Sequence, residues 1–102
     1  MKYIAISKDK IPYSFNILLG AELYTFEVNY NKREDLFTVN LIKDKQYLCY
    51  GEPLIYGSFL FQEYKDETFP IVHLVPMDEP FELEEVTWDN FQDTIFLMVF
   101  DG

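Results

Sequence analysis

The chain has 102 residues, a length that suits one small domain built around one hydrophobic core. Its 18 acidic residues and 8 Lys or Arg residues give a formal net charge of −10 at pH 7, which disfavours binding to nucleic acid or to anionic membranes. Cys49 is the only cysteine and cannot form an internal disulfide, and no apolar run approaches the roughly 20 residues of a transmembrane helix.

Two neighbouring segments near the N-terminus alternate apolar and polar residues. Residues 13–19 and residues 22–30 both carry aromatic and β-branched side chains at every second position. This period-two pattern is typical of half-buried strands. Because only Gly20 and Ala21 separate the two segments, we expect them to form a β-hairpin.

The middle of the chain predicts further strands. Residues 37–41 alternate in the same way, and after a turn of undetermined type at residues 43–45 the chain returns as a strand at residues 47–50. We expect residues 54–61 to form one bent strand or two short ones, with Gly57 at the bend.

The last third combines strands with an acidic stretch. A strand bracketed by prolines is expected at residues 69–76, and the most acidic stretch follows at residues 77–85. Residues 87–91 offer the one plausible helical turn, with Thr87 as its N-cap. Residues 94–100 are almost wholly apolar, which indicates a central strand or a strand whose outer face meets another chain.

Short strands and frequent turns, without a long stretch of helical periodicity, define the expected fold class. We predict an all-β protein, a single domain over residues 1–102 with about eight short strands arranged as a sandwich or a partly open barrel. The first eight residues contain too short an apolar stretch for a signal peptide, so we expect synthesis in a cytoplasm.

The negative charge is unevenly distributed. Residues 1–60 contain seven basic and seven acidic residues, whereas residues 61–102 contain eleven acidic residues and Lys65 as the only basic one. The whole net charge therefore lies in the last part of the chain and favours a basic partner. Ten Phe, eight Tyr and one Trp exceed what a small core readily encloses, so some rings are expected in a protein–protein interface.

Candidate catalytic residues are few. His73 is the only histidine and lies in a predicted strand between two apolar neighbours, so we expect a surface or structural role. Cys49 lies in an apolar run and is expected to be a buried core residue. The four glycines are too scattered for a phosphate-binding loop, and the acids gather in a polar run instead of facing each other across a cleft. We therefore expect neither an enzyme nor a bound cofactor.

Metal binding has one weak candidate. Asp89, Asn90 and Asp93 form the closest grouping of hard oxygen ligands, which suit calcium. The sequence has no EF-hand pattern, so we predict no metal site.

Three stretches, read in order, resemble one family of phage proteins. They are IPYSFNI at residues 11–17 with YTFEVNYN at 24–31; LFTVNL at 36–41 with YGEPLIYG at 50–57; and PIVHLVPMD at 70–78 with VTWDNF at 86–91 and IFL at 95–97. Their order and spacing resemble the phage baseplate plug proteins, small components of tail baseplates named from a cyanophage example. Members usually have a glycine near Asp44 and another after Phe91, where this chain has Lys45 and Gln92.

The resemblance implies a structural role at the baseplate hub, near the spike, in a phage or prophage-derived tail. It implies a location in the virion, assembly into a hetero-oligomer with hub, spike or wedge proteins, and no catalytic residues. We expect a docking surface in the acidic stretch, where apolar side chains alternate with carboxylates. Its predicted residues are Phe81, Glu82, Leu83, Glu84, Glu85 and Trp88.

Two other functions fit parts of the sequence. The acidic last part of the chain suits an inhibitor that mimics nucleic acid and occupies the DNA-binding groove of a host defence protein. Trp88 beside Asp89 and Asn90 suits a β module that binds calcium or carbohydrate.

Overall fold

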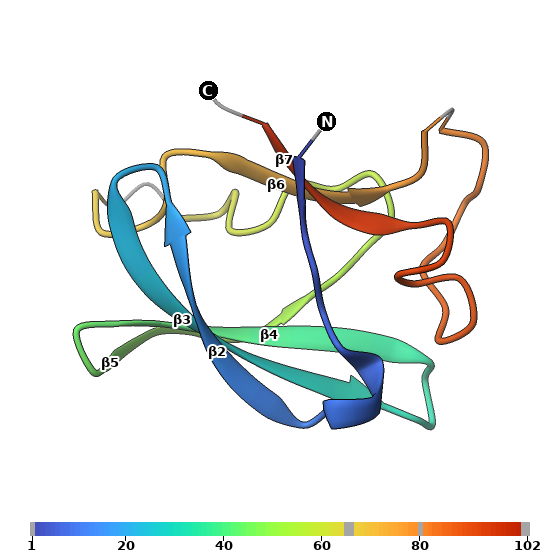
Figure 1. Ribbon diagram of the computed structural model, residues 1–102, viewed down its shortest axis with the longest axis horizontal. Helices are drawn as coiled ribbons and strands as arrows, with labels where there is room; N and C mark the ends of the chain where they lie inside the picture. The colour runs from blue at the N-terminus through green and yellow to red at the C-terminus, as the bar shows by residue number, and fades with distance from the viewer. Residues whose placement is uncertain (1, 65–66, 80, 101–102) are drawn as a thin grey trace.

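The computed structural model describes residues 2–64, 67–79 and 81–100 and forms two antiparallel sheets packed as a sandwich (Figure 1). The smaller sheet has the strand order β1-β7-β6, and the larger has the order β2-β3-β4-β5. The elements in chain order are β1 (Lys2–Ile4), the 3-10 helix η1 (Lys8–Lys10), β2 (Tyr13–Leu19), β3 (Glu22–Asn31), β4 (Leu36–Lys43), β5 (Gln46–Pro53), β6 (His73–Met77) and β7 (Phe96–Phe100). The all-β prediction is confirmed, and the sandwich replaces the alternative of a barrel.

The predicted hairpin of β2 and β3 is confirmed. Leu19 pairs with Glu22, so the connection contains only Gly20 and Ala21. Gly20 has a φ of 65°, the left-handed conformation that glycine adopts without a steric cost. A glycine at the first turn position fits a type II′ turn, whose twist matches that of the strands.

The turn between β4 and β5 is tight as well, but it contains no glycine. Lys43 pairs with Gln46, and the two residues between them, Asp44 and Lys45, have φ values of 52° and 66°. Two consecutive positive φ values are typical of a type I′ turn. Lys45, and likewise Gln92 with a φ of 71°, therefore occupies a backbone conformation that favours glycine.

One hydrophobic core lies between the sheets. The larger sheet turns an aromatic and β-branched face inward, and these side chains are at most 1% exposed. They are Tyr24, Phe26, Val28, Phe37, Val39 and Leu41. The smaller sheet contributes Ile4, Leu74 and Leu97, which also belong to this core. Period-two alternation predicted the inward face of β3 and β4, and Cys49 on β5 is buried as expected.

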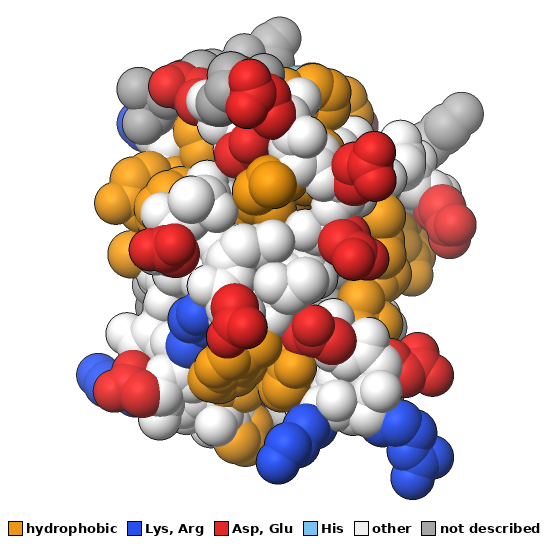
Figure 2. All heavy atoms as spheres, turned by 90° about the vertical axis from the view of Figure 1, so that its right-hand side faces the viewer, with side chains coloured by type: hydrophobic (Ala, Val, Ile, Leu, Met, Phe, Trp, Pro, Cys, Tyr) orange, Lys and Arg blue, Asp and Glu red, His pale blue; other side chains and the backbone are white. Residues whose placement is uncertain are grey.

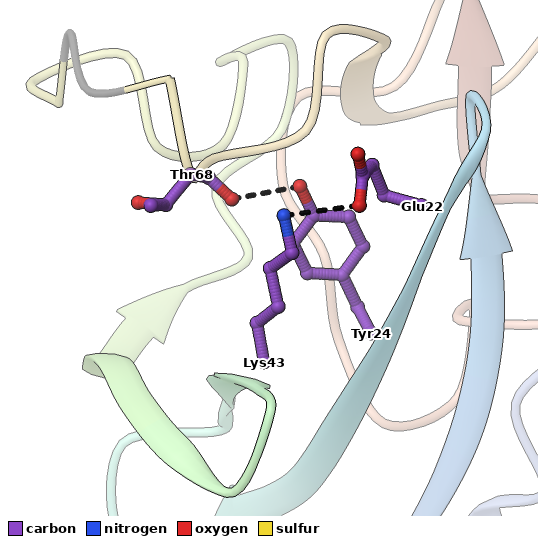
Figure 3. A network of polar contacts seen from close by, with 4 residues as sticks. All are labelled: Glu22, Tyr24, Lys43 and Thr68. Atoms are coloured by element: carbon purple, nitrogen blue, oxygen red, sulfur yellow. Dashed lines mark hydrogen bonds and ion pairs between the residues drawn. The ribbon is translucent and has the colours of Figure 1, made fainter.

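Polar contacts close one end of the core (Figure 3). The hydroxyl of the buried Tyr24 donates a hydrogen bond of 2.7 Å to the carbonyl oxygen of Thr68, in the segment before β6. Lys43 lies over the Tyr24 ring and forms a 3.1 Å ion pair with Glu22. Burial raises the pKa of Tyr24, although the nearby Lys43 ammonium opposes this effect. These contacts join the long β5–β6 connection to the larger sheet.

The prediction of a strand at residues 54–61 is wrong. This segment is irregular, and it covers the edge of β6 with backbone hydrogen bonds of 2.8 Å from Gly57 to Pro76 and from Leu60 to Leu74. Gly57 and Phe61 both have positive φ values, which an extended strand does not accommodate. The edge is thus protected by turns instead of a further strand.

Other boundaries differ from expectation. The predicted strand at residues 69–76 is regular only from His73, while β1 pairs with β7 and was not predicted. The turn at Thr87 is a single hydrogen-bonded turn, closed by a 3.0 Å bond from the Phe91 amide to the Thr87 carbonyl. The Thr87 hydroxyl accepts a bond from the Asn90 amide, which is the N-cap contact predicted for it.

We predict that Lys45→Gly stabilises the protein. A left-handed conformation costs a non-glycine residue about 1–2 kcal/mol, and the greater freedom of glycine in the unfolded chain offsets part of the gain. The free energy of unfolding in urea should rise by about 0.5–1 kcal/mol. The matched control is Gln46→Gly, on an exposed strand position with ordinary φ, which should lower it. Equal effects of the two variants would contradict the assignment of strain to Lys45.

Candidate docking surface

The predicted docking residues lie on the long connection between β6 and β7, here called the arm (residues 78–95). The arm leaves the end of β6 and returns to β7, the central strand of the smaller sheet (Figure 1). It has little regular structure, so its shape depends on contacts made by particular side chains. Two sets of contacts fix its two ends.

Asp78 fixes the first end. Its side chain is only 7% exposed and accepts hydrogen bonds from the Tyr56 hydroxyl, from the Glu82 amide at 3.1 Å and from the Leu83 amide at 3.4 Å. Burial alone would raise the pKa of Asp78, but these hydrogen bonds outweigh burial and lower it. Burial and the bond to the Asp78 carboxylate also raise the pKa of Tyr56 to about 12.

Trp88 fixes the second end. Its backbone amide donates a 2.8 Å hydrogen bond to Asp35, whose same oxygen accepts a 2.6 Å bond from the Tyr30 hydroxyl. Its ring lies 4.8 Å from that of Tyr30 and is nearly parallel to that of Phe37 at 5.7 Å, while the Lys8 ammonium lies 5.3 Å from the ring centre. Trp88 is 36% exposed and attaches the arm to the larger sheet.

The rest of the second half folds into the core. Phe91 and Ile95 are fully buried, and the Phe91 ring lies 4.7 Å from that of Phe37. The Asn90 carbonyl accepts backbone bonds from residues 93–95 at 3.0–3.1 Å, and the Asn90 side chain bonds to Thr87 and Glu85. Both ends of the arm are therefore fixed, and the exposed residues 81–85 lie between them.

Residues 81–85 are exposed. Phe81 is 57% and Leu83 39% exposed, and the carboxylates of Glu82, Glu84 and Glu85 lie at the surface. Figure 2 shows the side of the molecule on which the arm lies, with acidic side chains spread among hydrophobic ones and most basic side chains towards one edge. Apolar and anionic groups thus share one surface, as the sequence predicted for this stretch.

The structure does not gather all six predicted residues at one place. Glu82 and Leu83 line a groove of about 580 Å³, whereas Phe81 stacks on Tyr56 with ring centres 5.2 Å apart and lines a separate apolar hollow. Glu84 and Glu85 line a third depression of about 280 Å³. Trp88 lies apart from these hollows, as an anchor of the arm.

Residues that act on the arm from outside it were missed by the sequence analysis. Tyr56 and Asp35 hold its two ends through hydrogen bonds to partners 22 and 53 positions away in the sequence. The one local signal was the acidic composition of the arm, which did not distinguish the buried Asp78 from its exposed neighbours.

The candidate catalytic and metal-binding residues are described next. His73 is exposed at the start of β6, and its ring lies 5.3 Å from that of Phe59. Burial raises the pKa of the Cys49 thiol. Within the described ranges, no group of three or more His, Cys, Asp and Glu residues is placed to hold a metal ion. In the same ranges, no helix has the length and apolarity needed to cross a membrane.

Comparison with known proteins gives one family. The family model described as the cyanophage baseplate Pam3 plug gp18 matches residues 1–102. Neither the curated proteins nor the solved structures include a significant match to this chain.

We predict that Asp78→Asn destabilises the protein in a pH-dependent way. Because the folded-state pKa of Asp78 is lowered, its carboxylate stabilises the fold at pH values above the ordinary carboxyl pKa. This contribution is lost as the pH falls through the lowered value. The thermal midpoint of the variant should therefore lie below that of the wild type at pH 7, and the gap should narrow on acidification.

Glu79→Gln is the matched control, because it removes a neighbouring carboxylate that is exposed. Its thermal midpoint should stay close to that of the wild type at both neutral and acidic pH. A constant gap between Asp78→Asn and the wild type at every pH would contradict the ionic role of Asp78.

Proposed function

We propose that this chain, which belongs to the cyanophage baseplate plug family, is a plug associated with the baseplate hub and acts through contacts with other tail proteins. The family is a structural one of the phage tail baseplate, which gives the chain a structural role in the virion and no known enzymatic activity. Its hub, spike or wedge partners and its place in a hetero-oligomer belong to the proposal, as does synthesis in the host cytoplasm.

The single observation that carries the docking proposal is the arm. Its ends are held by Asp78 and Trp88, so the exposed residues 81–85 lie between two fixed points. A surface that is ordered before binding loses less conformational entropy on association than a flexible one. Large apolar side chains between carboxylates suit an interface with a basic partner, where charge steers association and apolar contacts supply affinity.

The nucleic-acid mimic is less well supported. Such a mimic needs carboxylates spaced regularly along one face, whereas here the exposed acids are interspersed with hydrophobic side chains (Figure 2). The carbohydrate or calcium module is also less well supported, because Phe37 and Lys8 contact the Trp88 ring and the Asn90 side chain bonds within the arm.

We predict that Glu82→Lys, Glu84→Lys and Glu85→Lys, combined in one variant, reduce incorporation into tail particles. Reversing these exposed charges should repel a basic partner and leave the core unchanged. The test is the amount of plug protein in purified tails of phage that carry the variant, with circular dichroism to verify folding.

The matched control reverses three exposed acids outside the arm, in Asp9→Lys, Glu63→Lys and Glu67→Lys. This variant has the same net charge and should enter tails as the wild type does. If the arm variant folds and enters tails normally, the arm is not the docking surface.

A further inference from the structure

The outer faces of the two sheets differ in chemistry. On the larger sheet this face is mostly polar, and several of its side chains bond to one another, although Leu18 and Leu23 are exposed at its hairpin end. Glu27 accepts hydrogen bonds of 3.0 Å from Asn40 and 2.7 Å from Tyr47, and the Thr25 hydroxyl donates a 2.7 Å bond to Asn16. This is the usual state of a sheet face that meets water.

The outer face of the smaller sheet is apolar and partly covered, because Val75 and Met98 on it are only 4% and 6% exposed. Its strand register places Val75 beside Met98 and Met98 beside Tyr3, with Met77 beside Phe96 in the next row. Leu74, Pro76 and Leu97 point the other way, into the core. The Tyr3 and Phe96 rings are 4.5 Å apart. β7 is thus apolar on both faces, although only its inner face is needed for the core.

A groove of about 580 Å³ crosses this outer face where the arm leaves β6. Its volume falls within the range of about 300–1,000 Å³ found for ligand pockets. Its apolar lining consists of Tyr3, Met77, Leu83, Phe96 and Met98. Its acidic lining consists of Asp78, Glu79, Glu82 and Asp93. Thr94 completes it.

A second, apolar hollow of about 310 Å³ adjoins the groove, and Met77 lines both. Phe59 and Phe81 stand at the side of this hollow and are 45% and 57% exposed, and Tyr3 in the groove is 50% exposed. Large apolar rings are therefore half-exposed along these two adjoining hollows. Contiguous apolar surfaces of this kind mark interaction sites on water-soluble proteins.

The charges around the groove select its occupant. Glu79, Glu82 and Asp93 are exposed, and no Lys or Arg is among the described residues that line the groove. The ion pair found among the described residues joins Lys43 to Glu22, and neither of these lines the groove. These carboxylates repel one another and attract a cation. A second copy of this chain would bring the same acids together, so its charge opposes docking here.

We propose that this groove binds a segment of another protein in which large apolar side chains are flanked by Lys or Arg. The apolar side chains would lie on Tyr3, Met77 and Phe96, which line the groove and are less buried than Met98. The cations would meet Glu79 and Asp93. The inference rests on the proposed baseplate function and deepens it, because it gives the partner segment a chemical character. Glu82 and Leu83 of the exposed stretch also line the groove, but Tyr3, Glu79 and Asp93 lie outside that stretch, so variants at these three positions test the groove separately.

A short peptide in which lysines alternate with leucine and phenylalanine is the probe. Titrated into the isotope-labelled full chain, it should shift the NMR signals of Tyr3, Met77, Phe96 and Met98. Binding should weaken about tenfold or more between about 50 mM and 500 mM salt, because screening removes the charge contribution. A peptide with glutamates in place of the lysines should not bind. Signals that shift elsewhere, or equal binding of both peptides, would overturn the inference.

Charge-reversed variants distinguish binding in the groove from a general effect of the net charge. Glu79→Lys with Asp93→Lys should weaken binding of the lysine peptide about tenfold or more, whereas Glu63→Lys with Glu67→Lys should not. Tyr3→Ser removes an apolar wall without a change of charge and should also weaken it. If the variant with Glu79→Lys and Asp93→Lys binds the lysine peptide as well as the control variant does, the inference is wrong.

Tail incorporation separates this inference from the proposed function. If Glu79→Lys with Asp93→Lys enters tails normally while the charge-reversed arm variant does not, the groove inference fails and the docking arm stands. If both enter normally, the docking proposal fails whatever the peptide does.

Discussion

The structure depends on covering the aromatic inner face of the four-stranded sheet. Tyr24, Phe26 and Phe37 line long strands, whereas the facing sheet has strands of only three to five residues. Those short strands cannot enclose so wide a face alone. The irregular segments complete the cover, as when Phe91 of the arm packs on Phe37 and Leu60 joins the core. The arm is therefore a part of the core as well as the carrier of the exposed acids.

Regular strands form one side of the core and irregular segments complete the other, and this difference explains which parts of the fold the sequence could predict. Strands β2 to β4 bury one face only, so their alternation gave the hairpin and the inward residues. Residues 54–61 are equally apolar, yet they are held by hydrogen bonds to β6 and by positive φ values at Gly57 and Phe61. β1 consists of three residues whose partner lies at the far end of the chain. Neither feature leaves a local periodic signal.

The candidate site was predictable in composition and less so in geometry. The acidic and apolar alternation of residues 81–85 located an exposed stretch correctly. It did not show that Asp78 turns inward to hold that stretch, or that Trp88 attaches the arm to Phe37 and Lys8. These roles depend on partners brought close by the sandwich. The apolar character of residues 94–100 allowed either a central strand or an outer face against another chain. β7 is central in its sheet, and the same strand presents Phe96 and Met98 to the groove.

In the proposed complex, the same carboxylates would have different effects before and after assembly. An apolar groove on a free protein invites self-association, and a rim of like charges opposes it because two copies would place their acids together. A partner with complementary charge removes that repulsion, so the rim that keeps copies apart then favours the complex. A small protein that must remain separate until it meets its site in an assembly needs both properties. The concentration of the −10 net charge in residues 61–102, beside the groove on the smaller sheet, provides them together.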